Sequence, residues 1–274
     1  MKAQPSARAV AIEPVLLRDN VGNIAVLTLN RPKTRNTLSE AMLAALADEL
    51  ATIAQDRTVR AVVLAAKGPA FSSGHDLKEL TTHRSDPDRG RAYFHEIMLT
   101  CCAMMQQVVH LPQPVIAAVQ GIATAAGCQL VASCDLAVAS AEAEFGVSGI
   151  NAGLFCSTPM VALSRNVARK HAMEMLLTGD LISAEDAFRI GLVNRVAPAG
   201  SEFDAALALA RKIAGKSSLV EKIGKKAFYR QLEMGLDEAY RYTAEVMVEN
   251  MMAHDAEEGI AAFVEKRDPK WEDR

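Results

Sequence analysis

Two glycine-rich segments have the composition of oxyanion-binding loops. Residues 68–77 read GPAFSSGHDL, residues 121–128 read GIATAAGC, and each follows an unbroken apolar run. Small side chains at the start of a helix leave its first backbone N–H groups unpaired and accessible to a ligand. Two such donors that face each other stabilise a developing oxyanion, and the loss of one typically costs about 3–4 kcal/mol of transition-state stabilisation. The pattern suits a thioester enolate or a tetrahedral intermediate.

Other catalytic chemistry has less support in the sequence. Ser72, His75 and Asp76 are too close along the chain to imply a hydrolase triad, and no Gly-x-Ser-x-Gly elbow is present. The five cysteines are odd in number and lack the Cys-x-x-Cys or Cys/His spacing of a zinc site. We therefore expect no metal, and we expect buried thiols in a reducing compartment.

The elements that position the two loops alternate between short apolar strands and helices. The expected strands are residues 15–17, 24–29, 61–66, 115–119 and 135–139, and the expected helices are about 40–55, 88–109 and 125–133. Thr37 and Glu40 have the spacing of a capping box before the first helix. This alternation predicts an α/β architecture with a largely parallel sheet, and ligands of such sheets bind at the carboxyl ends of the strands.

Composition limits the classes of protein that the chain can represent. Half of its 274 residues are hydrophobic, enough for a large core. The formal net charge is −3, and no basic run alternates with aromatic residues, so we expect no nucleic-acid partner. No apolar run reaches membrane-spanning length, so we expect no membrane partner. The first dozen residues lack the apolar core of a secretory signal, so we expect a cytoplasmic location, with residues 1–10 disordered.

After residue 196 the pattern changes to helices alone. The expected helices are about residues 201–214, 217–233, 237–252 and 255–264. We place a boundary at residue 198, between a core of residues 11–198 that holds both loops and a helical region of residues 199–274. Apolar residues such as Met247, Met251 and Met252 are numerous for so small a unit. The helical region is therefore expected to pack against the core or another subunit and to serve in oligomerisation.

Several short segments, in order along the chain, carry a resemblance to a known family. They are residues 29–36 (LNRPKTRN), 71–77 (FSSGHDL), 114–121 (PVIAAVQG), 134–137 (CDLA), 145–146 (FG), 177–180 (LTGD), 191–193 (GLV) and 262–267 (AFVEKR). Over about residues 15–271 the chain resembles the enoyl-CoA hydratase/isomerase (crotonase) family. Residues 72–80 and 123–135 narrow the resemblance to one branch of that family.

The resemblance implies a fold, an assembly and a class of substrate. Similar proteins are spirals of ββα units followed by a C-terminal helical trimerisation region, and they assemble as trimers or dimers of trimers. The implied partner is an acyl-CoA thioester, with coenzyme A as part of the substrate and no other cofactor. The core of residues 11–198 would then contain the acyl-CoA site.

The resemblance also assigns roles to single positions. The backbone N–H groups of His75 and Ala126 would form the oxyanion hole. The ring of His75 could itself act as a base, but we expect His75 to serve as a backbone donor with its ring turned outward. Gln129 would orient water or substrate, which completes the candidate catalytic set. The candidate positions for substrate or coenzyme A are Lys33, Arg35, Ser73, Asp76, Leu77, Gly127, Gly149, Cys156, Phe263 and Lys266, the last two reaching the coenzyme A of a neighbouring subunit.

The sequence departs from the family where hydration needs two glutamates. Gln129 stands at the first of these positions and Gly149 at the second. An amide can orient a water molecule, but it cannot accept a proton near neutral pH. Glu142 and Glu144 are expected to be solvated, and Cys156 or Ser157 would need an adjacent base to act as a nucleophile.

Three functions remain open from the sequence. The leading one is an acyl-CoA-processing enzyme, nominally of the hydratase/isomerase (lyase) type, that stabilises a thioester enolate. The others are a non-catalytic CoA-thioester-binding or assembly protein and an acyl-CoA thioester hydrolase. One fold with one oxyanion hole can support several reactions, so family alone does not decide among them.

Overall fold

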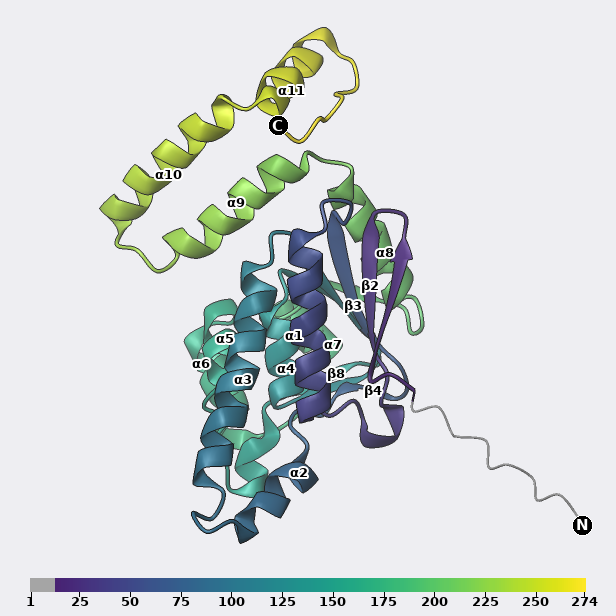
Figure 1. Cartoon of the computed structure of the whole chain (residues 1–274), viewed down its shortest axis with the longest axis vertical. Helices are drawn as coiled ribbons and strands as arrows, with labels where there is room; N and C mark the ends of the chain where they lie inside the picture. The colour runs from purple at the N-terminus through teal and green to yellow at the C-terminus, as the bar shows by residue number, and fades with distance from the viewer. Residues whose placement is uncertain (1–12) are drawn as a thin grey trace, which may run out of the picture.

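The main sheet has six strands in the order β1-β2-β3-β5-β7-β10. Figure 1 shows the computed structural model, which describes residues 13–274; the disorder expected for residues 1–10 lies outside them. β1 and β2 form an antiparallel hairpin, and the other neighbours pair in parallel. The strands are β1 (Leu16–Val21), β2 (Ile24–Leu29), β3 (Ala61–Ala66), β5 (Val115–Val119), β7 (Leu136–Ser140) and β10 (Arg195–Ala197).

A second sheet of four short strands has the order β4-β6-β8-β9. Its strands are β4 (Ala70–Ser72), β6 (Ile122–Thr124), β8 (Glu144–Gly146) and β9 (Ile182–Ser183). β4, β6 and β8 follow β3, β5 and β7 along the chain, so the chain repeats a long strand, a short strand and a helix. The predicted spiral of ββα units is therefore confirmed.

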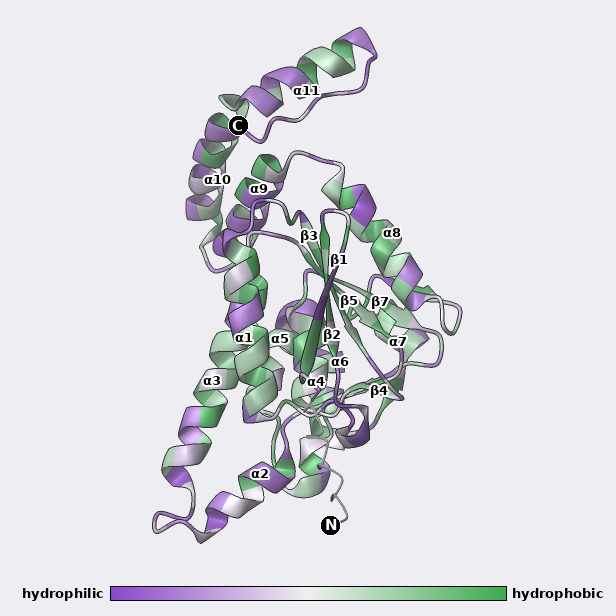
Figure 2. Cartoon of the chain, turned by 45° about the vertical axis from the view of Figure 1, so that its right-hand side comes forward, coloured by the Kyte–Doolittle hydropathy of each residue, from purple (hydrophilic) through white to green (hydrophobic). Residues whose placement is uncertain are grey.

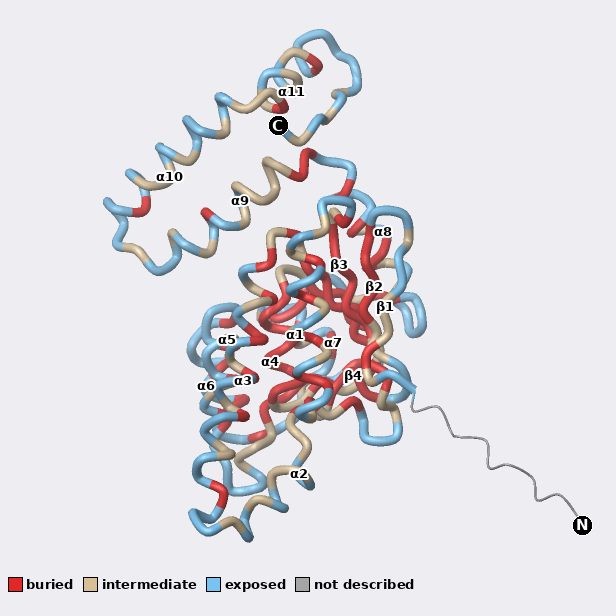
Figure 3. The backbone as a smooth tube through the Cα atoms, viewed as in Figure 1, coloured by how far each residue is buried: buried red, intermediate tan, exposed pale blue. Residues whose placement is uncertain are grey.

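Helices cover one face of the main sheet and enclose the larger hydrophobic core. α1 (Glu40–Gln55), α3 (Arg91–His110) and α4 (Ala126–Ser133) contribute buried residues to this core together with the strands. The remaining elements of the core body are η1 (Pro32–Thr34), α2 (Leu77–Thr82), η2 (His83–Ser85), η3 (Ser148–Ala152), α5 (Pro159–Asn166), α6 (Arg169–Thr178) and α7 (Ala184–Arg189). Figure 3 shows that burial is concentrated in the strands and in α4.

The cap of α1 differs from the expected capping box. Ser39, not Thr37, is the N-cap residue, and its hydroxyl accepts a hydrogen bond from the Met42 N–H at 3.3 Å. The Thr37 hydroxyl donates instead to Asp76 Oδ2 at 3.2 Å. Thr37 therefore braces a loop of another ββα unit, a tertiary contact that the local spacing did not indicate.

The opposite face of the main sheet is covered by α8 (Glu202–Ala214). Ala206, Leu207 and Ala210 of this helix form a second buried cluster with residues of β2, β3 and β5. The helical region predicted for residues 199–274 is thus not a uniform unit, since its first helix packs on the core sheet. α9 (Ser218–Gln231), α10 (Leu236–Met251) and α11 (His254–Glu265) extend beyond the core body as an arm (Figure 1). The role of this arm in oligomerisation stays a prediction.

A largely buried ion pair connects the arm to the core. Lys225 Nζ on α9 lies 2.6 Å from Asp135 Oδ2, and the Tyr229 hydroxyl donates to Asp135 Oδ1 at 2.9 Å. Lys225 also donates to the Gln113 carbonyl at 3.1 Å. Desolvation lowers the pKa of Lys225 and raises the pKa of Tyr229, with the Asp135 carboxylate opposing the first shift and adding to the second. The hydrogen bonds that surround this pair fix the direction in which α9 leaves the core.

The C-terminal residues hold the base of the arm against the core. The Asp273 carboxylate accepts a hydrogen bond from the Ser218 N–H at 2.8 Å and pairs with Arg60. The Trp271 Nε1–H donates to the Gly215 carbonyl at 3.1 Å. These contacts join the end of the chain to the junction between α8 and α9.

Glu221 beside this junction gives stability a dependence on pH. Burial, with Asp273 nearby, raises its pKa to about 7. Protonation of Glu221 therefore stabilises the folded state relative to the unfolded state. This contribution is complete below the ordinary pKa of 4.5 and is lost as the pH rises through about 7. We expect Glu221→Gln to raise the melting temperature by about 2–4 °C at pH 8, which is about 1 kcal/mol for a chain of this size, discounted for solvent screening.

At pH 5 the Glu221→Gln effect will be small, because the carboxyl of the folded wild-type chain is already protonated. Thermal scans of both proteins between pH 5 and pH 8 will measure the difference, with the exposed Glu238→Gln on α10 as a matched control. A Glu221→Gln effect that is the same at both pH values would contradict the assignment.

Hydropathy separates the core body from the arm. Figure 2 shows mainly hydrophobic strands in the main sheet, whereas α9, α10 and α11 mix hydrophobic and hydrophilic residues around their axes. Within residues 13–274, no helix combines the length and the apolar character that crossing a bilayer requires.

Candidate active site

The two glycine-rich loops lie in contact with each other. β4 and β6 pair in parallel, which places the residues that follow each strand side by side. A Cβ atom on Gly127 would lie 2.2 Å from the Ser72 carbonyl oxygen, so only glycine allows this approach. A Cβ on Gly74, whose φ is +84°, would lie 3.0 Å from the Ala126 nitrogen. The backbone of the residue before His75 therefore lies close to the amide of Ala126, with no room for a side chain between them.

The backbone N–H groups of His75 and Ala126 are free of hydrogen bonds to other described residues. Ala126 is the first residue of α4, where an N–H has no intrahelical partner. Its N-cap, Ala125, has φ 49° and ψ −122°, a conformation that residues with a side chain rarely adopt. Such strain costs about 1–3 kcal/mol and clusters at functional sites. The arrangement leaves two donors available on contacting loops.

Hydrogen bonds from a neighbouring turn fix the first loop. The Ser73 N–H donates to the Arg35 carbonyl at 3.0 Å, and the Leu38 N–H donates to the Gly74 carbonyl at 2.8 Å. The side chains of Lys33 and Arg35 are exposed on this turn. The fold thus brings the two candidate cationic positions next to the loop that carries His75.

Asp76 braces the same loop from the start of α2. Its carboxylate is the N-cap of α2 and accepts hydrogen bonds from the N–H groups of Lys78 at 2.9 Å and Glu79 at 3.4 Å. The contact with Thr37 is made by its second oxygen. The next residue, Leu77, is 56% exposed, which leaves an apolar side chain open to a ligand at this surface.

The ring of His75 is not turned outward, contrary to the expectation from the sequence. Both ring nitrogens are buried, and neither forms a hydrogen bond of good geometry with the described residues, although the Leu38 backbone is near enough to oppose the effect of burial on the pKa of the ring. Burial lowers the pKa of the ring, so the neutral imidazole is favoured at neutral pH. His75 therefore adds no positive charge beside its backbone N–H.

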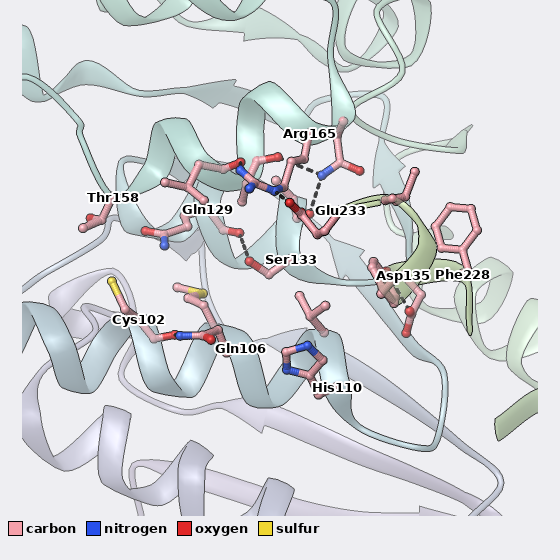
Figure 4. Close-up of a pocket in the computed structure, with 18 of the residues that line it drawn as sticks. Cys102, Gln106, His110, Gln129, Ser133, Asp135, Thr158, Arg165, Phe228 and Glu233 are labelled. Carbon is pink, nitrogen blue, oxygen red and sulfur yellow. Dashed lines mark hydrogen bonds and ion pairs between the residues drawn. The ribbon is translucent and has the colours of Figure 1, made fainter. Parts of the chain in front are cut away.

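Gln129 lies on a cavity of about 780 Å³ between α3, α4, α5 and α9. Its side chain is 4% exposed, and its Oε1 has no hydrogen-bond partner in the described chain. Figure 4 shows the amide near Cys102 and Thr158, which come from α3 and the start of α5. Ala126 is three residues before Gln129, so both lie on the same face of α4, one turn apart. The free amide can hydrogen-bond to water or to an acyl group.

The carboxylates that line this cavity are already engaged. Asp135 forms the ion pair with Lys225. Glu233 Oε1 lies 3.2 Å from Arg165 Nε in an exposed ion pair, whose two side chains Figure 4 draws close together. Other polar groups on the cavity wall include the hydroxyls of Ser133, Ser157 and Thr158 and the imidazole of His110. Ser157 donates to the Phe155 carbonyl at 3.3 Å and has no basic partner among the described residues. The cavity can therefore hold water without supplying a carboxylate base.

Gly149 occupies a position that is closed to any side chain. A Cβ atom there would lie 2.7 Å from Cys156 Sγ and 2.7 Å from the Leu154 carbonyl oxygen. The Leu154 N–H donates to the Gly149 carbonyl at 2.9 Å, which fixes this contact. The Cys156 thiol donates to the Val147 carbonyl at 3.4 Å, and burial raises its pKa, which disfavours the thiolate.

We expect Gly149→Ala to lower the free energy of unfolding by about 1–3 kcal/mol, the range for overpacking. The double variant with Cys156→Ala will recover part of the loss, because the sulfur contact is removed while the Leu154 carbonyl remains. Urea denaturation measures both. Gly153→Ala is the matched control, since no atom lies within 4 Å of its added Cβ and only its φ of +75° opposes the change. Additive effects of the two changes at 149 and 156 would contradict the packing argument.

Comparison with known proteins assigns the chain to a family. The sequence model described as "Enoyl-CoA hydratase/isomerase" matches residues 19–274. The chain belongs to the enoyl-CoA hydratase/isomerase family. The human mitochondrial protein named enoyl-CoA hydratase domain-containing protein 3 is 47% identical over 253 residues, which cover 92% of this chain and 81% of that protein. Residues 72–80 and 123–135 indicated the branch of the family to which this human protein belongs. The similarity confirms the resemblance both to the family and to that branch.

Solved structures of hydratase/isomerase family members share the fold. An enoyl-CoA hydratase from Mycobacterium smegmatis is 53% identical, with a TM-score of 0.90 over 94% of this chain and 99% of that one. Human enoyl-CoA hydratase domain-containing protein 3 is 47% identical, with a TM-score of 0.89 over 94% of this chain and 100% of that one. The predicted fold class is confirmed by both likenesses.

Two family positions lie far from the loops in this chain. Phe263 on α11 is 85% exposed, and Lys266 is the C-cap residue of the same helix. Figure 1 shows α11 and α2 at opposite ends of the molecule. Neither residue is brought to the site that the other candidate positions surround. The sequence also gave no sign of the cavity walls on α3, α5 and α9, because the apolar residues there match ordinary core positions.

Proposed function

We propose that the chain binds acyl-CoA thioesters and polarises the thioester carbonyl with the N–H groups of His75 and Ala126. The close approach of the Gly74 backbone to the Ala126 amide carries this proposal, because it holds two unpaired donors on adjoining loops. Fixed donors of this kind stabilise negative charge as it develops on oxygen. Gln129, one turn along α4, orients water or substrate in the cavity that receives the acyl group.

The reaction that we propose is of the hydratase/isomerase type without the two-glutamate mechanism. An enolate held in the oxyanion hole is the shared intermediate, and the proton must come from solvent or from the substrate. Family membership supports an enzyme of this kind. The absence of a free carboxylate on the cavity, and the closed position at Gly149, favour a second candidate: a non-catalytic CoA-thioester-binding or assembly protein.

Isotope-edited infrared spectroscopy tests the first step without requiring turnover. The carbonyl band of [1-¹³C]butyryl-CoA will move to lower frequency on binding, and Ala126→Pro, which removes the N–H, will abolish that shift. If the carbonyl band does not move when the wild-type protein is fully occupied by the thioester, the proposal is refuted. Mass spectrometry of 2-enoyl and saturated CoA thioesters then separates the candidates. Added water, an isomer or free CoA would name a reaction, and binding without product would favour the binding protein.

We also propose that the arm associates with other copies, as a trimer or a dimer of trimers. The exposed apolar residues on the arm support this, and they include Phe228, Leu232, Leu236, Tyr240, Met247, Met252, Phe263 and Val264. The distance between α11 and the loops supports it further. Phe263 and Lys266 can contribute to a coenzyme A site only if that site belongs to another subunit.

A further inference from the structure

A second cavity lies on the other face of the main sheet, where α8 begins. It has a volume of about 370 Å³ and is lined by β1, β2, β3, β5 and the first two residues of α8. Val26, Ala65 and Ala118 form its apolar floor, and they belong to the cluster that packs on α8, not to the core beneath α4. No lysine or arginine is among the residues that line it. We call this cavity the α8 hollow.

The α8 hollow contains a carboxylate with one buried oxygen that has no partner among the described residues. Glu202, the first residue of α8, is 7% exposed, and its Oε2 has no hydrogen-bond partner in the described chain. No ion pair within residues 13–274 includes it. Buried charges in proteins are normally paired or bind a ligand. The N-terminus of α8 favours the negative charge, but it does not supply the missing donor to Oε2.

A second acceptor in the α8 hollow also lacks a donor. Gln120 Oε1 is buried and has no partner among the described residues, while its Nε2 donates to the Gly68 carbonyl at 3.0 Å. Asp19 adds a second carboxylate to the lining, at an exposed position on β1. The polar part of the hollow is therefore rich in acceptors and negative in charge.

We propose that the α8 hollow binds an alkylammonium group. A primary ammonium ion carries three N–H donors and one positive charge, which match Glu202 Oε2 and Gln120 Oε1 and leave one donor for Asp19 or water. Its alkyl chain packs against Val26, Ala65 and Phe203. A divalent metal ion fits less well, because it requires about six oxygen ligands and the walls are mainly apolar.

The position of the α8 hollow links it to the two loops. Gln120 directly precedes the second loop, and its side-chain amide donates a hydrogen bond to Gly68, the first residue of the first loop. The two loops are packed tightly there, since a Cβ on Gly121 would lie 2.2 Å from the Pro69 carbonyl oxygen. An ammonium ligand bound to Gln120 would hold both loops in place from the face of the main sheet that α8 covers. This site does not depend on the proposed function, and its test needs no turnover.

Thermal unfolding in the presence of n-butylammonium chloride tests the proposal, with sodium chloride added to hold ionic strength constant. A ligand that binds only the folded chain raises the melting temperature in a saturable manner. We expect such a rise for the wild-type protein and none for n-butanol. Glu202→Gln will bind at least about tenfold more weakly, since it loses a hydrogen bond to a charged group. Asp204→Asn, at an exposed position in the same helical turn, is the matched control and will bind as the wild type does.

Three results would overturn the proposal: no saturable rise in the wild-type protein, an equal rise with n-butanol, or an equal rise in Glu202→Gln. If Glu202→Gln does not fold, Ala66→Leu fills the α8 hollow from its partly exposed rim, and undiminished binding by this variant would also refute the site.

Sedimentation velocity identifies the source of the ammonium group. If a lysine of a second copy supplies it, butylammonium will compete and convert the wild-type protein to smaller species. If the natural ligand is a free amine, the sedimenting species will not change. Either result, together with the dependence on Glu202, supports an alkylammonium site.

Discussion

Gly127→Ala will reduce any thioester turnover by about 10²–10³-fold, the effect of losing one oxyanion donor. The added Cβ would lie 2.2 Å from the Ser72 carbonyl oxygen, and no rotation of a side chain relieves contact with a backbone atom. Ser72 cannot retreat easily, because its hydroxyl donates to the Asn36 carbonyl at 2.8 Å. The start of α4 must therefore move, which carries the Ala126 N–H away from His75.

The carbonyl band of bound butyryl-CoA will report this movement in Gly127→Ala even if the wild-type protein shows no turnover. Gly224→Ala is the matched control, since it lies in α9 and no atom is within 4 Å of its added Cβ. That control will keep the wild-type carbonyl band and gain about 0.5–1 kcal/mol of stability from the helical alanine. Urea denaturation shows whether Gly127→Ala is folded. A folded Gly127→Ala with the wild-type band would refute the role of the loop contact.

Gln129→Glu will confer slow hydration on 2-enoyl-CoA thioesters. Glutamate has nearly the shape of glutamine, so the change places a carboxylate on the cavity one turn from Ala126 without repacking α4. A positioned general base contributes about 10²–10⁴-fold to rate. We expect the lower end of that range, because Gly149 leaves no second carboxylate to complete the proton transfer.

The gain is measured as 3-hydroxyacyl-CoA formed by the variant and not by the wild-type protein. Gln106→Glu is the matched control, because it adds the same charge to the same cavity from an exposed position on α3. Hydration by the control at an equal rate would show that charge alone suffices. If Gln129→Glu binds the thioester but forms no product, the amide does not mark the place of a catalytic base.

The long strands were predictable because their sequences carry a local signal. β3 and β5 have the predicted bounds, since unbroken runs of valine, alanine, leucine and isoleucine lie between turn residues. β4, β6 and β8 were not predicted, because three residues are too few for a period to emerge and their pairing depends on distant segments. The start of α1 at Glu40 illustrates the same limit, because Thr37 contacts Asp76 in another unit and Ser39 caps the helix.

The loops of the candidate site were also predictable, because glycine at a strand-to-helix turn is itself a signal. The contact of Gly127 with Ser72 depends on two segments that lie far apart in sequence, so its tightness appears only in the structure. The same holds for the His75 ring, whose orientation depends on its neighbours in space. The cavity beside Gln129 combines four helices, and no segment alone indicates it.

The packing at Gly149 has a consequence for the routes by which this chain could change. A glutamate placed at that position meets the sulfur of Cys156 and the carbonyl of Leu154 at once. The substitution is therefore harmful until the segment around Leu154 and Cys156 has rearranged, whereas a glutamate at Gln129 meets no such obstacle. A pair of carboxylates requires a glutamate at both positions. The substitution at Gln129 is accessible first, and the substitution at Gly149 can follow only after this rearrangement. The packing around Gly149 therefore prevents this chain from gaining two-carboxylate catalysis by single substitutions alone.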